Sequence, residues 1–276
     1  MKLQVDNLTI YRGKKCILHQ IHFEVNPGEL TVILGANGAG KSTLLEAIGG
    51  ELPYQSGSIL LDGQDKVKWN TQQLARQRAF LRQSSTLNLG FTVEDLVLMG
   101  RSPHMGRYES RTDLDIVHQA LALVGLPNFE HRIYTQLSGG EQQRVHLARV
   151  LAQVWMPTLL NPSTEPLNAS ASSPSSLLLL DEPTSSLDLR AQHQVLQCAS
   201  RFIRAGGSVI CILHDLNLAA QYADRLLILS QGQLLANGSV DDVLHPHILK
   251  EAFNIESIVL RNSNLDHPVV ITQAGA

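Results

Sequence analysis

The segment Gly35-Ala36-Asn37-Gly38-Ala39-Gly40-Lys41-Ser42 decides the fold of this chain. It fits the phosphate-loop pattern GxxxxGK[ST] at every fixed position. A short apolar run, Leu30–Leu34, precedes the segment, and a helical pattern begins near Lys41. Glycines leave backbone N–H groups accessible to phosphates, and a helix N-terminus favours anions. The order strand, glycine-rich loop and helix therefore predicts an α/β fold that binds nucleotide phosphates.

The side chains of this loop have distinct predicted roles. Lys41 is expected to reach the β- and γ-phosphates, and the Ser42 hydroxyl to ligate Mg²⁺. The alternative, a glycine-rich turn without function, fits the flanking strand and helix less well. The predicted nucleotide-binding residues of this segment are Gly35, Ala36, Asn37, Gly38, Ala39, Gly40, Lys41, Ser42 and Thr43.

A second signal is the run Leu177–Leu180, which is followed by Asp181 and Glu182. Four apolar residues before two carboxylates indicate a buried strand that delivers acids at its C-terminal end, where ligands bind in open α/β sheets. We expect Asp181 to hold Mg²⁺ and Glu182 to accept a proton from the attacking water. The alternative is a strand that ends in a solvated acidic turn.

The pattern around these motifs predicts the fold class. Two runs near the N-terminus, Leu3–Ile10 and Ile17–Val25, read as antiparallel strands joined by a turn. The block Thr92–Leu126 has helical spacing and predicts a separate helical lobe. After Leu177, apolar strands alternate with helices, which predicts a mainly parallel core sheet flanked by helices.

Two segments carry weak structural signals. Residues 156–176 are rich in proline and serine and have no periodicity, so we interpret them as a flexible insertion. A long surface loop is tolerated thermodynamically, so we expect little effect on the nucleotide chemistry. The tail beyond about Ile255 matches no pattern that would place it.

Composition limits the classes of partner. The formal net charge is -3, which argues against nucleic acid as a partner and against a polybasic membrane contact. The three cysteines are scattered, as is typical of free thiols in a reducing compartment. The first residues lack the apolar core of a secretory signal, and no run approaches the ~20 apolar residues that span a bilayer. Membrane association would therefore need a partner protein.

Residues 137–144, LSGGEQQR, resemble the signature motif of the ABC ATPase family. A serine and two glycines at a helix start present a hydroxyl and N–H donors to an anion. A serine with a glutamate three residues on is also a capping box, and both interpretations can hold together. In the family this motif contacts the ATP of a partner subunit, which assigns that role to Ser138, Gly139, Gly140 and Glu141.

Four further positions match the family residue by residue. Tyr11 falls where the family stacks an aromatic ring on adenine, and Asp188 lies in a segment similar to the D-loop. Gln83 resembles the glutamine that touches Mg²⁺ or water, and His214 resembles the switch histidine that bonds the γ-phosphate. With Glu182, the resemblance thus gives Gln83 and His214 catalytic roles. Three of them also have an ordinary alternative: Tyr11 as a strand aromatic, Gln83 as a polar strand end and His214 as a histidine with a structural partner.

The resemblance covers roughly Leu3 to Leu244 and implies a P-loop NTPase of the ABC ATPase type. It predicts one ATP-binding cassette over residues 1–254, with a helical subdomain at about 84–154, and a C-terminal tail at 255–276. The chain holds one phosphate loop and one signature, whereas the family pairs these across two cassettes. A second copy, forming a head-to-tail homodimer with ATP and Mg²⁺ between the subunits, is the implied assembly.

The segment from Thr92 to His104, TVEDLVLMGRSPH, is similar to an importer subgroup that handles iron–siderophore complexes, cobalamin and haem. In the family this region docks a permease helix; the alternative is a plain helix end with Gly100 as its C-cap. The phrase Ala148–Trp155 and the extended loop most resemble haemin-import ATPases. The resemblance implies two integral-membrane permease subunits, an indirect periplasmic binding protein and a place at the cytoplasmic face of the bacterial inner membrane. A siderophore or cobalamin importer, an exporter and a soluble non-transport ATPase remain the alternatives.

Overall fold

The computed structural model describes residues 1–83, 90–160 and 176–273. Contacts between residues divide the chain into two compact units. The first unit holds Met1 with Trp69–Val209, and the second holds Lys2–Lys68 with the chain from Ile210 onward. Most of the predicted flexible insertion, residues 161–175, lies outside the described residues.

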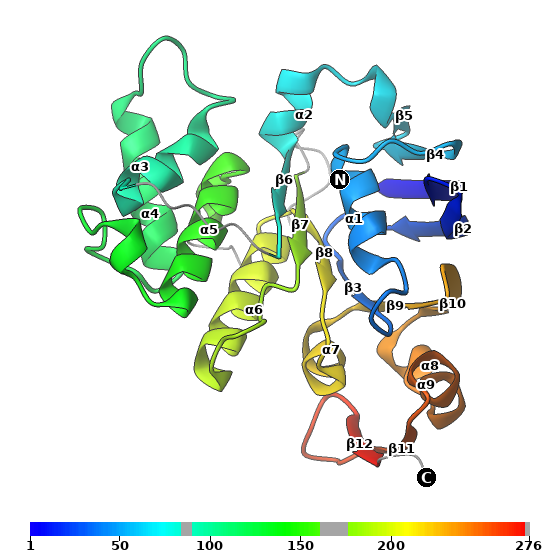
Figure 1. Cartoon of the computed structure of the whole chain (residues 1–276). Coiled ribbons are helices and arrows are strands. Elements are labelled where there is room, and N and C mark those ends of the chain that lie inside the picture. Colours follow the sequence, from blue (N-terminus) through cyan, green and yellow to red (C-terminus); the bar gives the residue numbers. More distant parts are fainter. Residues whose placement is uncertain (84–89, 161–175, 274–276) are drawn as a thin grey trace. The chain divides into compact units, whose positions relative to one another are not determined.

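An antiparallel sheet forms the N-terminal part of the second unit, as the sequence predicts (Figure 1). Strands β1 (Leu3–Arg12) and β2 (Lys15–Val25) pair antiparallel, and β1 also pairs with β4 (Ser56–Leu61), which pairs with β5 (Gln64–Asp65). Leucine and β-branched residues alternate with polar ones along β1, so one face is buried and the other is accessible.

A second sheet of this unit carries the phosphate loop. Strand β3 (Leu30–Leu34) is buried at every position and runs parallel to β9 (Arg225–Ser230), which pairs antiparallel with β10 (Gln233–Gly238). Continuous apolar character is what a strand covered on both faces requires. Helices α1 (Lys41–Gly49), α7 (Leu216–Tyr222), α8 (Val240–Val243) and α9 (Pro246–Phe253) belong to the same unit. Strand β8 (Ser208–Ile212) begins in the first unit and ends in the second.

In the first unit, β6 (Arg78–Leu81) and β7 (Leu177–Asp181) run parallel with Leu81 opposite Leu180. Helices α2 (Thr71–Gln77) and α6 (Leu189–Arg204) adjoin these strands in sequence. Strand β6 ends two residues before Gln83. Parallel strands with matched ends deliver the residues that follow them to the same edge of the sheet.

The predicted helical lobe is present but is not one continuous helical block. It consists of α3 (Val93–Leu98), α4 (Arg111–Leu123) and α5 (Gly139–Gln153), with short 3-10 turns at Met99–Arg101 and Tyr134–Gln136 (Figure 1, green). Each of the three α-helices begins with a capping box, in which the N-cap hydroxyl and a carboxylate three residues later bond each other's backbone N–H. Other short 3-10 turns of the chain are Lys66–Lys68 and Pro157–Leu159.

A buried ion pair holds this lobe together. Arg101 Nε donates to Asp113 Oδ1 at 2.9 Å, and both side chains are less than a tenth exposed. Arg101 Nη1 also donates to the backbone oxygen of Ala152 at 2.7 Å, which ties the start of α4 to the end of α5. Burial alone would raise the pKa of Asp113, but hydrogen bonds from Ser110 and Arg101 outweigh it and hold that pKa below 3.8.

We expect Asp113→Ala to lower the free energy of unfolding by about 3 kcal/mol, because it leaves the Arg101 charge buried and unpaired. Asp95→Ala is the matched control: Asp95 has the same capping-box position on α3 but is exposed, so its loss should cost only about 1 kcal/mol. Urea unfolding measures both.

The same ion pair has a pH dependence. Since the folded-state pKa of Asp113 is depressed, its contribution is fully present above the unfolded-state pKa and is lost as pH falls through the folded-state pKa. The stability difference between wild type and Asp113→Ala should therefore shrink below about pH 4. Equal costs for the two aspartates at pH 7 would contradict the role of the buried pair.

The tail that the sequence could not place folds into a hairpin. Strand β11 (Glu256–Leu260) pairs antiparallel with β12 (Val269–Gln273), and Val259 lies opposite Val270. Among the helices of the described residues, none has the length and apolar character needed to cross a bilayer.

Candidate nucleotide-binding site

The phosphate loop of the second unit has backbone shapes that only glycine accepts. Gly35, Gly38 and Gly40 have φ values of 151°, 80° and 104°. A Cβ at Gly35 would lie 2.3 Å from the Leu229 oxygen, and one at Gly40 would lie 2.5 Å from Leu18 Cδ2. Gly35 is thus required both by conformation and by space, whereas Gly38, where an added Cβ would meet nothing within 4 Å, is favoured by conformation alone.

The helix after the loop lacks the usual side-chain cap. Gly40 is the N-cap of α1, it supplies no side-chain hydrogen bond, and the first turn holds no acidic residue. The N–H groups of a helix start need partners, and this end of the helix carries partial positive charge. An uncapped N-terminus after a glycine cradle fits the phosphates of a nucleotide.

Lys41 is the cation of this loop. Lys41 is buried, and its Nζ donates to the backbone oxygens of Gly35 at 2.8 Å and Ala36 at 3.1 Å. The ammonium is therefore held over the loop itself, where a phosphate would meet it. Ser42 and Thr43 follow on the first turn of α1, and Thr43 is buried.

The aromatic position lies on the neighbouring sheet. Tyr11, near the end of β1, is 42% exposed, and its backbone N–H donates to Gln55 Oε1 at 2.8 Å. The next residue, Arg12, forms a 2.6 Å ion pair with Glu46 on α1. These contacts tie the end of β1 to the helix that follows the phosphate loop and leave the Tyr11 ring accessible for stacking.

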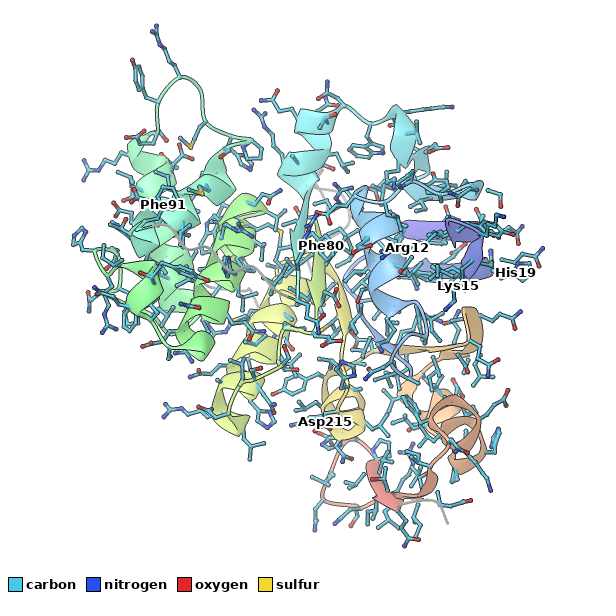
Figure 2. All side chains as sticks on the ribbon, in the orientation of Figure 1. Arg12, Lys15, His19, Phe80, Phe91 and Asp215 are labelled. Carbon is cyan, nitrogen blue, oxygen red and sulfur yellow. The ribbon has the colours of Figure 1, made fainter. Side chains whose placement is uncertain are left out.

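His214 follows Leu213, the first residue after the end of β8. The Leu213 N–H donates to the Ile33 oxygen at 3.3 Å, which places it beside the strand that leads into Gly35. His214 itself is exposed. Asp215 then caps α7, because its Oδ1 accepts from the N–H groups of Asn217 and Leu218 at 2.7 and 3.0 Å (Figure 2).

In the first unit, Gln83 and Glu182 meet. Gln83 Nε2 donates to Glu182 Oε2 at 2.5 Å, as the parallel pairing of β6 and β7 leads one to expect. Asp181 is the last residue of β7 and is 5% exposed. The predicted carboxylate pair is thus divided: Asp181 is buried at the strand end, and Glu182 is partly accessible and held by an amide.

The backbone of Glu182 is in the left-handed region, with φ at 50°. Its carbonyl oxygen accepts from Ser185 N at 3.2 Å, Ser185 Oγ at 2.9 Å and Gln143 Nε2 at 3.4 Å. Gln143 Nε2 also donates to the Pro183 oxygen at 2.7 Å. Hydrogen bonds from Ser185 and Gln143 therefore hold Glu182 in a conformation that few non-glycine residues adopt, and this orients its carboxylate.

Sequence reasoning assigned no role to Gln143. It lies on α5, just over one turn beyond the N-cap Ser138, and joins the signature helix to the turn after β7. The only sequence signal for it is its place inside the LSGGEQQR segment. The contact means that the signature and the candidate base belong to one hydrogen-bonded network in the first unit.

The signature segment forms the capping box that the sequence allows. Ser138 Oγ accepts from Glu141 N at 3.3 Å, while Glu141 Oε2 accepts from Ser138 N and Oγ at 2.8 Å each. The backbone and side-chain hydrogen bonds from Ser138 lower the pKa of Glu141. A Cβ added at Gly139 would meet no atom within 4 Å, whereas a Cβ added at Gly140 would lie 3.2 Å from Leu187 Cδ2. Gly139 therefore leaves the start of the helix open.

Asp188 has a local structural task. It is the N-cap of α6, and its Oδ1 accepts from the Ala191 N–H at 2.8 Å. The residue after it, Leu189, is 77% exposed. The segment similar to a D-loop thus presents an apolar side chain to solvent from the first turn of α6.

Residues of the Gly100–His104 segment contact α5. Gly100 is not the C-cap of α3: that helix ends at Leu98, and a Cβ at Gly100 would lie 2.1 Å from the Arg149 oxygen on α5. His104 Nε2 bonds the Gln153 oxygen at 2.7 Å, and burial lowers the pKa of His104. The glycine is required for close packing against α5 rather than for a helix end.

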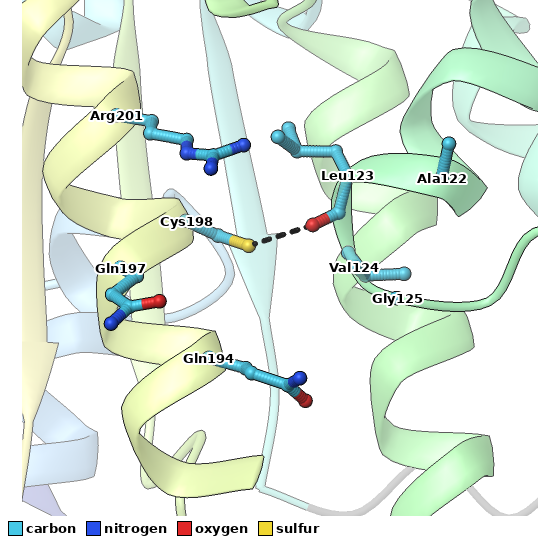
Figure 3. A pocket seen from close by; sticks show the side chains of 8 residues that line it. All are labelled: Ala122, Leu123, Val124, Gly125, Gln194, Gln197, Cys198 and Arg201. Atoms are coloured by element: carbon cyan, nitrogen blue, oxygen red, sulfur yellow. Dashed lines mark hydrogen bonds between the residues drawn. The ribbon is translucent and has the colours of Figure 1, made fainter. Parts of the chain in front are cut away.

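A cavity of about 210 Å³ lies between α4 and α6 in the first unit (Figure 3). Gln194, Gln197, Cys198 and Arg201 line it from α6, and Cys198 Sγ donates to the Leu123 oxygen at 3.3 Å. Burial raises the pKa of Cys198 to about 11. The thiol is protonated at neutral pH, so it is a poor nucleophile.

Comparisons with known proteins find relatives over nearly the whole chain. The ABC transporter family matches residues 18–159. The chain is 47% identical over 93% of its length to the hemin import ATP-binding protein HmuV of Plesiomonas shigelloides, covering 96% of that protein. The protein of that name from Pseudomonas aeruginosa is 45% identical, over 98% of this chain and 100% of the relative.

Two solved structures extend the comparison. One, described as an inward-facing metal-chelate type ABC transporter, has a TM-score of 0.78 and 26% identity, covering 98% of this chain and 97% of the other. A nucleotide-free ATP-binding cassette from an ABC transporter has a TM-score of 0.74 at 21% identity, covering 91% and 98%. The fold is thus an ABC ATPase fold, with a mixed sheet flanked by helices and an antiparallel N-terminal sheet.

Proposed function

We propose, since the chain belongs to the ABC transporter family and is one of its ATP-hydrolysing proteins, that it is the energy-coupling subunit of an importer that takes up hemin. ATP binding rests on the uncapped start of α1 behind a glycine cradle that a Cβ would fill. The hemin assignment rests on identities of 44–47% over nearly the whole chain with hemin import ATP-binding proteins from three bacteria.

The nucleotide-binding residues then divide the task. The N–H groups of the segment from Gly35 to Thr43 and the Lys41 ammonium bind phosphate oxygens, and the accessible Tyr11 ring stacks on the base. His214 bonds the γ-phosphate from the end of the strand beside β3. Gln83 and Ser185 hold Glu182, which takes the proton of the attacking water.

The side chains suited to Mg²⁺ are oxygen donors, as that ion prefers. The Ser42 hydroxyl, the Asp181 carboxylate and the Gln83 amide oxygen would hold it together with phosphate oxygens. Asp181 fits this role, because its carboxylate stands at the C-terminal end of β7, the edge where ligands bind in open α/β sheets. Bound Mg²⁺ would neutralise charge on the phosphates.

The assembly that we propose is a head-to-tail homodimer. Each chain has one phosphate loop and one signature, so the ATP held by one copy would meet Ser138, Gly139, Gly140 and Glu141 of the other. Asp188 and the exposed Leu189 would face the partner from the start of α6. ATP favours the closed dimer, and hydrolysis releases it, which turns phosphate chemistry into motion.

Two integral-membrane permease subunits complete the importer and hold the chain at the cytoplasmic face of the inner membrane. A periplasmic binding protein acts on the other side of those subunits. The ATPase does not contact the cargo, so a ferric siderophore or cobalamin is the second candidate substrate. Similarity to a metal-chelate type transporter structure fits all three cargoes.

Uptake in a source strain that lacks this chain tests the assignment. We expect hemin uptake to be lost, and ferric-siderophore and cobalamin uptake to be retained. Wild-type chain should restore hemin uptake, whereas a Glu182→Gln chain expressed at the same level should not. Normal uptake of all three would contradict an importer role and make export the leading alternative.

A further inference from the structure

The C-terminal hairpin of β11 and β12 is attached to α9, α8 and α7 of its own unit (Figure 1, red). Lys250 on α9 pairs with Glu256 at 2.6 Å, and Arg261 pairs with Asp241 on α8. Both pairs are more than half exposed, so they contribute little to the hairpin's attachment. The contact with α7 is of a different kind.

Asn217 on α7 bonds the backbone of Val270 twice. Its Nδ2 donates to the Val270 oxygen at 3.1 Å, and its Oδ1 accepts from the Val270 N–H at 2.8 Å. The N–H and C=O of one strand residue point to the same side, so the amide occupies the outer edge of β12 as a further strand would. Val270 is 4% exposed. Only a side chain with both a donor and an acceptor can make this pair of bonds.

Asn217 is also part of the segment that follows His214. Its backbone N–H donates to Asp215 Oδ1 at 2.7 Å, in the cap that starts α7. One residue therefore bonds the N-cap through its backbone and the hairpin through its side chain. A shift of β12 would be passed to Asp215, and Asp215 is the neighbour of His214.

We propose that the C-terminal hairpin fixes the position of His214 through Asn217, which makes Asn217 a positioning residue for ATP hydrolysis. This inference rests on the proposed role of His214 at the γ-phosphate. The hairpin sets how His214 is presented and touches no phosphate itself. Loss of the Asn217–Val270 bonds should therefore slow hydrolysis and leave ATP binding by the phosphate loop unchanged.

The test uses the full-length chain with Asn217→Ala and Asn217→Asp. The first removes both bonds, and the second keeps an acceptor but sets a carboxylate against the Val270 oxygen. Gln221→Ala, on an exposed position one turn later, is the matched control. We expect kcat to fall roughly tenfold in both Asn217 variants, with the KM for ATP within about twofold. Gln221→Ala should match the wild type.

Hydrogen exchange supplies a readout that is independent of catalysis. Amides of 214–218 and 269–273 should exchange faster in both Asn217 variants, whereas those of the phosphate-loop helix α1 should not change. Faster exchange with an unchanged kcat would overturn the proposal, because the hairpin would then be anchored without positioning His214. Unchanged exchange would overturn it as well.

A second background separates this proposal from the proposed function. In His214→Ala, the further change Asn217→Ala should lower kcat no more, since the two residues act as one unit. Full activity of His214→Ala alone would refute the role of the histidine itself. A reduced His214→Ala with an additive loss from Asn217→Ala would refute only the positioning role.

Discussion

The Glu182→Gln variant is expected to bind ATP with wild-type affinity and to hydrolyse it roughly 10² to 10⁴ times more slowly. Glutamine has the shape of glutamate but cannot accept the proton of the attacking water. The backbone of Glu182 is held by Ser185 and Gln143, and those bonds go to its carbonyl oxygen. The substitution therefore leaves the turn after β7 in place and removes only the basic oxygen.

ATP turnover and equilibrium binding of ATP measure the two halves of this expectation. Because binding survives without hydrolysis, size-exclusion chromatography with ATP should show a trapped dimer, while the wild type returns to monomer as ATP is consumed. Glu109→Gln, an exposed carboxylate of the same unit, is the control for loss of one charge. Turnover near the wild-type value would exclude Glu182 as the base.

The parts of the site that lie within a few residues of a motif were predictable. Strand, loop and helix around Lys41 follow from local rules, because glycine geometry and apolar runs are properties of short segments. Gln83 and Glu182 were assigned to one catalytic site only through the family resemblance. The structure adds the 2.5 Å bond between the two side chains.

Contacts that depend on long-range packing could not be predicted. The sequence offered Gly100 as a helix C-cap only as an alternative, and nothing in it indicated that the missing Cβ serves an approach to Arg149, which lies 49 residues further along the chain. Arginine is usually a surface residue, but hydrogen bonds from Arg101 to Asp113 and to the Ala152 oxygen offset the cost of burying its charge. The hairpin at 256–273 was missed because its strands are short and carry few core residues: Ile258, Leu260 and Ile271 are nearly half exposed.

The Lys41→Ala variant should lose measurable ATP binding. A hydrogen bond to a charged group contributes about 1.5–3 kcal/mol, and Lys41 is expected to make two, to the β- and γ-phosphates. Their loss therefore amounts to about 3 kcal/mol or more, which is at least a hundredfold weaker affinity. Isothermal titration calorimetry measures the effect directly.

Lys66→Ala is the matched control for this change. The Lys66 ammonium also donates to a backbone oxygen of α1, that of Ala47, but at the C-terminal end of the helix, away from the phosphate loop. Both variants remove one lysine that bonds the α1 region, so both should have similar, slightly reduced thermal stability. Only Lys41→Ala should lose ATP, because only its charge stands where the partial positive end of the helix meets the phosphates. Equal ATP affinity in the two variants would mean that the segment from Gly35 to Ser42 does not bind phosphate.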